Sequence, residues 1–158
     1  MLFKRFMNFF IPCFFGIIIP GILQLRIKIK IINNTYFFQD ELKVGSIILG
    51  ILGLGLMFIS AKIIYSDLDT PLWDKPPSKL VKYGPYKYTR NPMTMGMLIV
   101  LMSESIFFNS FILLIWFLIF FMISQILIIK IEEPSLSKKF GDEYTIYQIQ
   151  TPRWFKLI

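Results

Sequence analysis

The chain lacks histidine altogether, and it holds a single cysteine among its 158 residues. Without histidine there is no imidazole-ligated haem, no zinc site with a histidine ligand and no histidine-activated nucleophile. One cysteine excludes an intramolecular disulfide and a cysteine-rich metal centre. The glycine-rich fingerprints of P-loops and dinucleotide sites are missing as well. We therefore expect a chemistry that uses no metal.

Charged residues are also scarce, at 17% against 55% hydrophobic residues. A soluble domain of this size cannot bury so much apolar surface. Uncharged runs at 6–25 and 44–61, and a run at 91–129 that holds one charge, account for the excess. About 20 apolar residues suffice to cross the hydrocarbon core of a bilayer. The sequence therefore predicts an all-α, polytopic membrane protein forming a single domain over 1–158.

We expect four transmembrane helices in this domain. Their predicted ranges are 6–25, 44–65, 91–108 and 111–131. The third should begin at Asn91-Pro92, since asparagine favours the N-cap and proline the first helical position. The last two form a hairpin, with its turn near Asn109-Ser110.

A further helix is predicted at 134–148, after the last span. Leu136, Phe140, Tyr144 and Tyr147 recur there at spacings of four, four and three, which places them on one helical face. Lysines and acidic residues occupy the other face. This pattern is typical of an amphipathic helix lying at a membrane surface.

The net charge of +7 is explained by membrane orientation. With the N-terminus in the cytoplasm, 13 of the 17 lysines and arginines fall on the cytoplasmic side, as the positive-inside rule requires. The N-terminus, the loop at 66–90 and the C-terminal tail are then cytoplasmic. We expect the lipid bilayer, and not nucleic acid, as the partner of the basic residues.

The hairpin brings two charged segments to the same cytoplasmic end. Arg90 and Asn91 stand where one helix begins, and its free N–H groups suit a carboxylate. Glu132 and Glu133 stand where the other helix ends, against the negative end of its dipole. This acidic pair is either solvated at the interface or binds a cationic or hydroxyl-rich ligand. Together the two segments suit a zwitterionic amino acid that carries a sugar.

Two other features allow more than one interpretation. Tyr83, Tyr86 and Tyr88 form either an aromatic belt at the level of the lipid headgroups or the wall of an aromatic pocket. Glu104 is the one charge inside the hairpin and lies close to its turn. That position favours an interfacial or structural role over a catalytic one.

Two blocks of sequence resemble one family of membrane enzymes. Gly84-Pro85-Tyr86, then Arg90-Asn91-Pro92-Met93 and Gly96, resemble a G-x-Y…R-[HN]-P-x-x-x-G signature. The second block runs from Glu132-Glu133 through Leu136, Phe140-Gly141, Tyr144 and Tyr147 to Thr151-Pro152-Arg153. Both are similar to the isoprenylcysteine carboxyl methyltransferases and the related phospholipid N-methyltransferases. These are integral membrane enzymes that use S-adenosylmethionine, and the similarity covers about 69–154.

The resemblance implies a cofactor site and two residues with further roles. The positions that match the family's S-adenosylmethionine contacts are Ser78, Lys79, Leu80, Val81, Tyr86, Asn91, Pro92, Met93, Thr94 and Glu132. As a mechanistic hypothesis, Arg90 holds the amino-acid end of the cofactor while the methyl group is displaced in line. Glu133 is the candidate for positioning the acceptor or removing its proton. The acceptor is a lipid-soluble molecule.

Three positions depart from the family pattern. Asn91 replaces a histidine, Thr94 replaces a tyrosine, and Ile128 stands where the isoprenylcysteine enzymes place an arginine for the substrate carboxylate. The acceptor is therefore open among a phospholipid amine, a prenylated thiol's carboxylate, a small thiol and an isoprenoid. Two other classes compete: an NADPH-dependent membrane reductase of similar helical layout, and a non-catalytic helical subunit.

Overall fold

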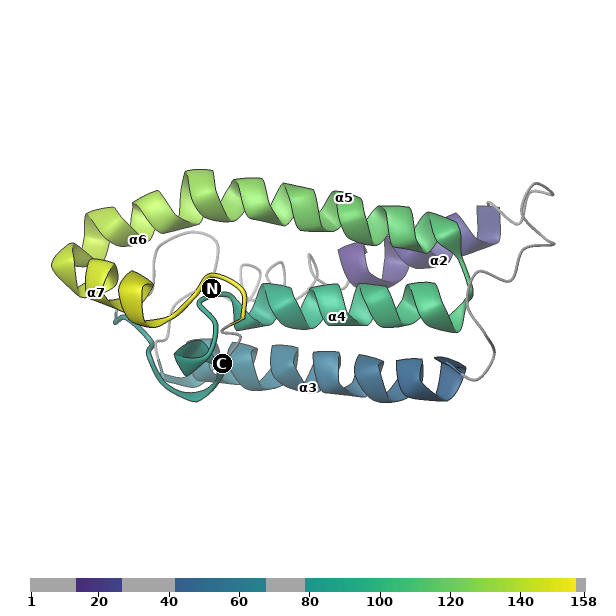
Figure 1. Ribbon diagram of the computed structural model, residues 1–158, viewed down its shortest axis with the longest axis horizontal. Helices are drawn as coiled ribbons and strands as arrows, with labels where there is room; N and C mark the ends of the chain where they lie inside the picture. Colours follow the sequence, from purple (N-terminus) through teal and green to yellow (C-terminus); the bar gives the residue numbers. More distant parts are fainter. Residues whose placement is uncertain (1–13, 27–41, 68–78, 156–158) are drawn as a thin grey trace.

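The computed structural model describes residues 14–26, 42–67 and 79–155. Every regular element in these ranges is helical, as the sequence predicts (Figure 1). The long helices are α3 (Leu42–Asp67), α4 (Pro92–Phe107) and α5 (Phe111–Leu127). The shorter elements are η1 (Phe14–Ile18), α2 (Ile19–Arg26), η2 (Gly84–Lys87), η3 (Ile128–Glu132), α6 (Glu133–Phe140) and α7 (Asp142–Gln150).

Helices α3, α4 and α5 lie side by side, with α4 in the middle (Figure 1). Small residues let α3 and α4 approach closely, because a Cβ added at Gly96 would lie 2.7 Å from the carbonyl oxygen of Gly53. Helix α3 ends, and α4 begins, at the end of the bundle where α7 lies. We call this end, on the left in Figure 1, the α7 end.

The predicted hairpin turn is confirmed at the opposite end. Asn109 has a φ of 49°, a left-handed conformation that asparagine tolerates better than most residues. The amide of Ser110 then donates to the carbonyl of Ser105 at 3.0 Å and closes the turn. Leu101 on α4 and Leu113 on α5 are each 1% exposed and belong to the core.

Two helical stretches are long and apolar enough to cross a membrane, Leu42–Ile64 and Phe111–Phe140. Only 17% of the apolar window of each is buried inside the protein. A core helix of a soluble protein hides most of its apolar side chains, whereas these side chains face outward. The result supports two of the four predicted spans. Helix α4 has 16 residues and is shorter than a usual span, and residues 6–13 of the first predicted span lie outside the described ranges, so these two spans stay predictions.

The tail differs from the single surface helix predicted at 134–148. It consists of α6 and α7, which are separated at Gly141. The backbone there has φ 51° and ψ −126°, a conformation that glycine alone adopts without strain. Tyr144 and Tyr147 are 2% and 4% exposed, so they pack against the protein itself. The regular apolar spacing in this part of the tail therefore reflects internal packing instead of a membrane-facing surface.

Candidate functional site

Three charged side chains from distant parts of the sequence meet at the α7 end. Arg90 Nη1 donates to Glu133 Oε1 at 2.9 Å. Arg153 binds the same carboxylate with two hydrogen bonds, from Nε at 2.8 Å and from Nη2 at 2.9 Å. The side chains of Arg90 and Glu133 are only 10% and 13% exposed. We call Arg90, Glu133 and Arg153 the charge cluster.

The C-terminal segment holds this cluster in place by running back across the start of α4 (Figure 1). The amide of Arg90 donates to the carbonyl of Pro152 at 3.0 Å. Thr89 Oγ1 and Asn91 Nδ2 each donate to the carbonyl of Arg153, also at 3.0 Å. Residues on both sides of Arg90 therefore fix the backbone that carries Arg153.

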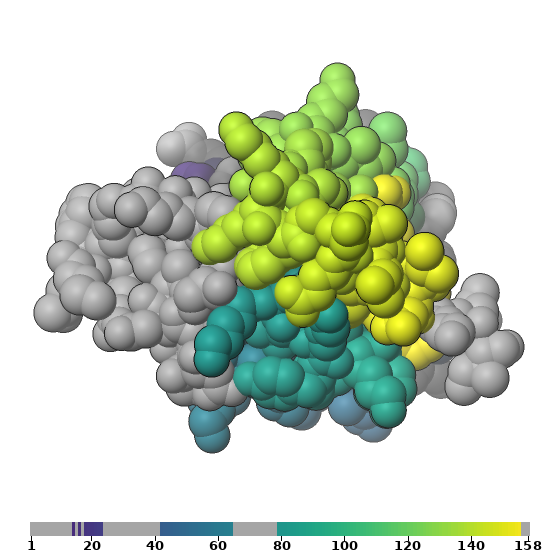
Figure 2. All heavy atoms as spheres, turned by 90° about the vertical axis from the view of Figure 1, so that its left-hand side faces the viewer, coloured from purple at the N-terminus to yellow at the C-terminus, as the bar shows by residue number. Residues whose placement is uncertain are grey.

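Two buried tyrosines join α7 to the rest of the site. The hydroxyl of Tyr147 donates to the carbonyl oxygen of Tyr86 at 2.6 Å. The hydroxyl of Tyr144 accepts from Arg90 Nη1 at 3.3 Å. Burial raises the pKa of the phenols of Tyr86, Tyr144 and Tyr147 above the ordinary value of 10.0. In the space-filling view of the α7 end, α6 and α7 lie directly against the segment that contains η2 (Figure 2).

Element η2 itself depends on a glycine. Gly84 has a φ of 60°, and an added Cβ would lie 2.8 Å from a methyl carbon of Ile63 on α3. Both the conformation and the close approach favour glycine at this position. Tyr86 then packs with Val81 and Ile64 in a small buried cluster. The glycine of the G-x-Y motif thus lets η2 dock on the end of α3.

The charge cluster carries one net positive charge, because two guanidinium groups face one carboxylate. Burial by itself would raise the pKa of Glu133, but the hydrogen bond from Arg153 and the positive charges of both arginines outweigh it and lower the pKa. Glu133 follows the apolar stretch of its helix, which ends at Ile131. Arg90 Nε is buried and has no hydrogen-bond partner in the described part of the chain. The cluster can therefore accept a further anionic group.

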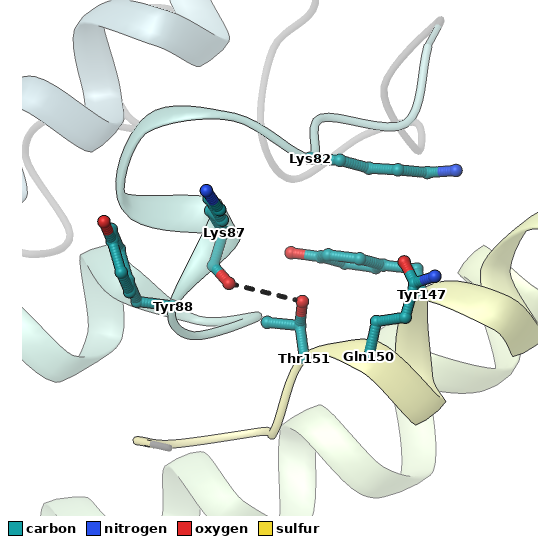
Figure 3. A pocket seen from close by; sticks show the side chains of 6 residues that line it. All are labelled: Lys82, Lys87, Tyr88, Tyr147, Gln150 and Thr151. Carbon is teal, nitrogen blue, oxygen red and sulfur yellow. Dashed lines mark hydrogen bonds between the residues drawn. The ribbon is translucent and has the colours of Figure 1, made fainter. Parts of the chain in front are cut away.

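Two hollows lie near this cluster. A pocket of about 380 Å³ lies between η2 and α7 (Figure 3). An apolar groove of about 360 Å³ lies among α3, α4, α5 and the C-terminal segment. The groove is lined by Leu49, Met95, Leu98, Ile99, Met102, Phe117, Phe121 and Trp154. No group of three or more acidic or cysteine side chains within 14–26, 42–67 and 79–155 is placed to hold a metal ion.

A family model described as phospholipid methyltransferase matches residues 45–143. The match extends over well more than half of the chain. The chain belongs to the phospholipid methyltransferase family. No curated protein matches the sequence. Membership in this family confirms the resemblance seen in the sequence motifs, and together with the two apolar helices it supports a membrane methyltransferase.

The structure brings together the two charged segments that the sequence analysis placed at one end of the hairpin. Arg90 contacts Glu133, whereas the neighbouring Glu132 is exposed. Asn91 occupies the N-cap position of α4, but its side chain makes no capping hydrogen bond and binds the C-terminal segment instead. The predicted meeting of the arginine and the acidic pair is thus confirmed, with Glu133 as the partner.

The residues predicted to contact the cofactor differ in how far they are buried. Val81, Tyr86 and Pro92 are buried. Leu80, Met93 and Thr94 are partly buried, Lys79 is exposed, and Ser78 lies outside the described residues. None of them lines the pocket between η2 and α7. Their roles toward a cofactor stay predictions.

Sequence reasoning predicted no contact of Arg153 or Tyr144 with the charged site, and it gave Trp154 no role. Arg153 ends the second block of the family resemblance but lies beyond the segment that the family model matches, and its spacing does not predict a contact with Glu133. Tyr144 was attributed to a membrane-facing helix. Trp154 donates from its indole Nε1 to Gln125 Oε1 at 2.8 Å and lines the groove. The three-residue motif Thr151-Pro152-Arg153 was the available signal for the first of them.

Proposed function

We propose that this family member uses S-adenosylmethionine to methylate a lipophilic acceptor in the membrane. The observation that supports this most strongly is the charge cluster at the start of α4, which unites both sequence blocks of the family resemblance. A methyltransferase of this kind needs a polar site for its cofactor next to an apolar site for its acceptor. The α7 end offers both within a few residues of one another.

The residues at this end fit the amino-acid part of the cofactor. The charge cluster has one net positive charge, and Arg90 Nε is a buried donor without a partner in the described residues, so a carboxylate fits there. The free N–H groups at the start of α4 favour the same charge. Glu132 is exposed next to the cluster and suits an ammonium group or ribose hydroxyls. We assign the remaining contacts to Ser78, Lys79, Leu80, Val81, Tyr86, Asn91, Pro92, Met93 and Thr94.

The bound cofactor supplies an activated methyl group on a sulfonium centre. The residues of the chain then have to bind the cofactor and the acceptor, orient them and exclude water. They need not generate a strong nucleophile. Glu133 is a poor proton acceptor, because both arginines stabilise its ionised form and lower its pKa. We therefore propose that Glu133 positions Arg90 and Arg153, and that Arg90 contacts the cofactor.

The apolar groove supports a lipophilic acceptor. Its lining residues Met95 and Trp154 directly follow the predicted cofactor residue Thr94 and the cluster residue Arg153. A hydrocarbon chain in this groove would therefore end close to the polar site. Ile128 is 2% exposed, so the position of the substrate-binding arginine in the isoprenylcysteine enzymes is here a buried apolar side chain. This difference favours a phospholipid amine over a prenylcysteine carboxylate.

We further propose that the α7 end faces the cytoplasm in a multi-pass arrangement, with both termini on that side. The support is the positive-inside count, in which 13 of 17 basic residues fall on this side. A water-soluble cofactor would then reach the site from the cytoplasm, while the acceptor would enter sideways from the bilayer.

Calorimetric titration of the purified protein in detergent with S-adenosylmethionine tests the proposal. We expect Arg90→Ala to weaken binding roughly 10- to 100-fold, since a charge-assisted hydrogen bond contributes about 1.5–3 kcal/mol. Glu132→Ala should also weaken it, and Lys138→Ala, an exposed site on α6, should not. Unchanged affinity in both site variants, despite intact folding, would overturn the assignment.

A second titration and a labelling experiment separate the competing classes. Binding of NADPH instead of S-adenosylmethionine would indicate a reductase, and binding of neither would indicate a non-catalytic subunit. Membranes incubated with a methyl-labelled donor should yield labelled lipid. Label in a volatile product or in protein would point to a small thiol or a prenylated protein as the acceptor.

A further inference from the structure

The pocket between η2 and α7 is lined by six residues that each carry a polar or cationic group, although carbon atoms form most of its exposed wall. The six residues are Lys82, Lys87, Tyr88, Tyr147, Gln150 and Thr151. One wall is held in place, because Tyr147 and Thr151 are each 4% exposed and hydrogen-bonded to backbone carbonyls. Figure 3 shows both lysines on the η2 side and Tyr147, Gln150 and Thr151 on the opposite wall. The pocket is thus a half-open hollow with one buried wall.

The hydrogen-bond donors of the pocket are only partly used within the protein. The hydroxyls of Tyr147 and Thr151 donate to the carbonyls of Tyr86 and Lys87. In the described part of the chain, no such bond engages the ammonium group of Lys87, the hydroxyl of Tyr88 or the side-chain amide of Gln150. Three side chains that line the cavity therefore keep donors without an acceptor from the described part of the chain.

The charges of the pocket favour a singly charged anion. Lys82 forms an ion pair with Glu143 at 2.9 Å, while Lys87 forms none with any residue that the structure describes. Two ammonium groups and one carboxylate leave one net positive charge. Unpartnered N–H and O–H donors beside a net positive charge are the chemistry that proteins use to bind a phosphate oxygen. The volume of about 380 Å³ falls in the range of small-ligand sites.

Both walls of the pocket continue directly into the charge cluster. Tyr88 is followed by Thr89 and Arg90, and Thr151 is followed by Pro152 and Arg153. The pocket nevertheless shares no residue with the cluster, with the predicted cofactor contacts or with the apolar groove. It is therefore a separate site that borders them.

We propose that this pocket is a phosphate-binding site, with Lys87 as its main cationic group and Lys82 as the second. The bound group is a phosphate or phosphate ester, supplied either by the headgroup of a membrane phospholipid or by a free phosphate in solution. This inference goes beyond the proposed function, because it requires neither methyl transfer nor a bound methyl donor.

The test is a titration of the full chain in a non-ionic detergent at about 150 mM salt, where long-range charge effects are screened. The probes are inorganic phosphate, a water-soluble dihexanoyl phosphatidylethanolamine, and dihexanoylglycerol as a phosphate-free counterpart. We expect one phosphate-dependent site. Lys87→Gln should weaken it roughly five- to tenfold, and Glu143→Gln, which releases Lys82, should strengthen it about two- to threefold.

The matched control is Lys138→Gln, which removes one positive charge from the exposed surface of α6. Binding of both phosphate probes in competition supports the proposal, binding of the phospholipid alone identifies a headgroup as the source, and binding of inorganic phosphate alone identifies a free anion. The proposal is overturned when neither probe binds, when Lys138→Gln weakens binding as much as Lys87→Gln, or when dihexanoylglycerol binds as well as the phospholipid.

Parallel titrations with S-adenosylmethionine keep this inference distinct from the proposed function. A protein that binds phosphate through Lys87 but no methyl donor would retain the phosphate site and lose the methyltransferase assignment. A protein that binds the methyl donor but neither phosphate probe would retain the methyltransferase assignment and lose the phosphate site.

Discussion

Replacing Glu133 by glutamine is the most direct test of the charge cluster, because it removes one charge and keeps the shape of the side chain. The carboxylate accepts three hydrogen bonds from Arg90 and Arg153. In Glu133→Gln, the amide group points a donor at a guanidinium, and two positive charges face each other without a counter-charge. Breaking a buried ion pair costs about 3–5 kcal/mol. Arg153 is 28% exposed, so its solvation by water offsets part of this cost. We expect Glu133→Gln to lower the free energy of unfolding by about 2–4 kcal/mol.

Thermal unfolding of the purified protein in detergent measures this effect. For a chain of this size 1 kcal/mol corresponds to roughly 2–4 °C, so the midpoint should fall by about 5–15 °C. Glu143→Gln is the matched control, since Glu143 pairs with Lys82 where both side chains are more than a third exposed. A surface pair of this kind contributes about 0–1 kcal/mol. Equal midpoints for the two variants would refute the view that the cluster stabilises the α7 end.

Three further outcomes follow from the structure. The pKa of Glu133 is lowered in the folded protein, so its contribution to the stability of the fold is complete above the ordinary pKa of 4.5 and is lost as the pH falls below that value. The difference in unfolding midpoint between the natural protein and Glu133→Gln should therefore shrink below pH 4.5 and stay constant above it. Gly96→Ala should lower the midpoint, at a cost of about 1–3 kcal/mol, because its Cβ meets the backbone of α3, whereas Gly55→Ala, which meets nothing within 4 Å, should not lower it. Tyr147→Phe leaves the buried carbonyl of Tyr86 without its donor and should cost about 1–3 kcal/mol by chemical denaturation, and a loss below about 0.5 kcal/mol would contradict the role given to this bond.

The helices were largely predictable from the distribution of charge. The ranges expected at 44–65 and 111–131 correspond to α3 and to α5 with η3, because long apolar runs can satisfy their backbone hydrogen bonds in a membrane only as helices. The turn at Asn109 was predictable from its residue types. Helix α4 begins at Pro92, as expected from the preference of proline for the first helical turn.

The tail was predicted less well, because one pattern of apolar residues fits two environments. A spacing of four, four and three places Tyr144 and Tyr147 on one face whether that face meets lipid or protein. Only the left-handed conformation at Gly141 turns α7 back so that both tyrosines pack on the site. The sequence contains this glycine but does not state how far the chain turns there.

The amino-acid sequence alone determined that Arg90 and the acidic pair would share one end of the molecule, because a short turn between two helices forces their far ends together. It could not decide which glutamate would meet Arg90, since neighbouring helical residues point about 100° apart and the sequence does not fix how the helix is rotated about its axis. The tertiary structure selected Glu133 and added Arg153 from the end of the chain. That selection rests on side-chain directions and on a returning C-terminal segment, which depend on contacts between residues far apart in the sequence.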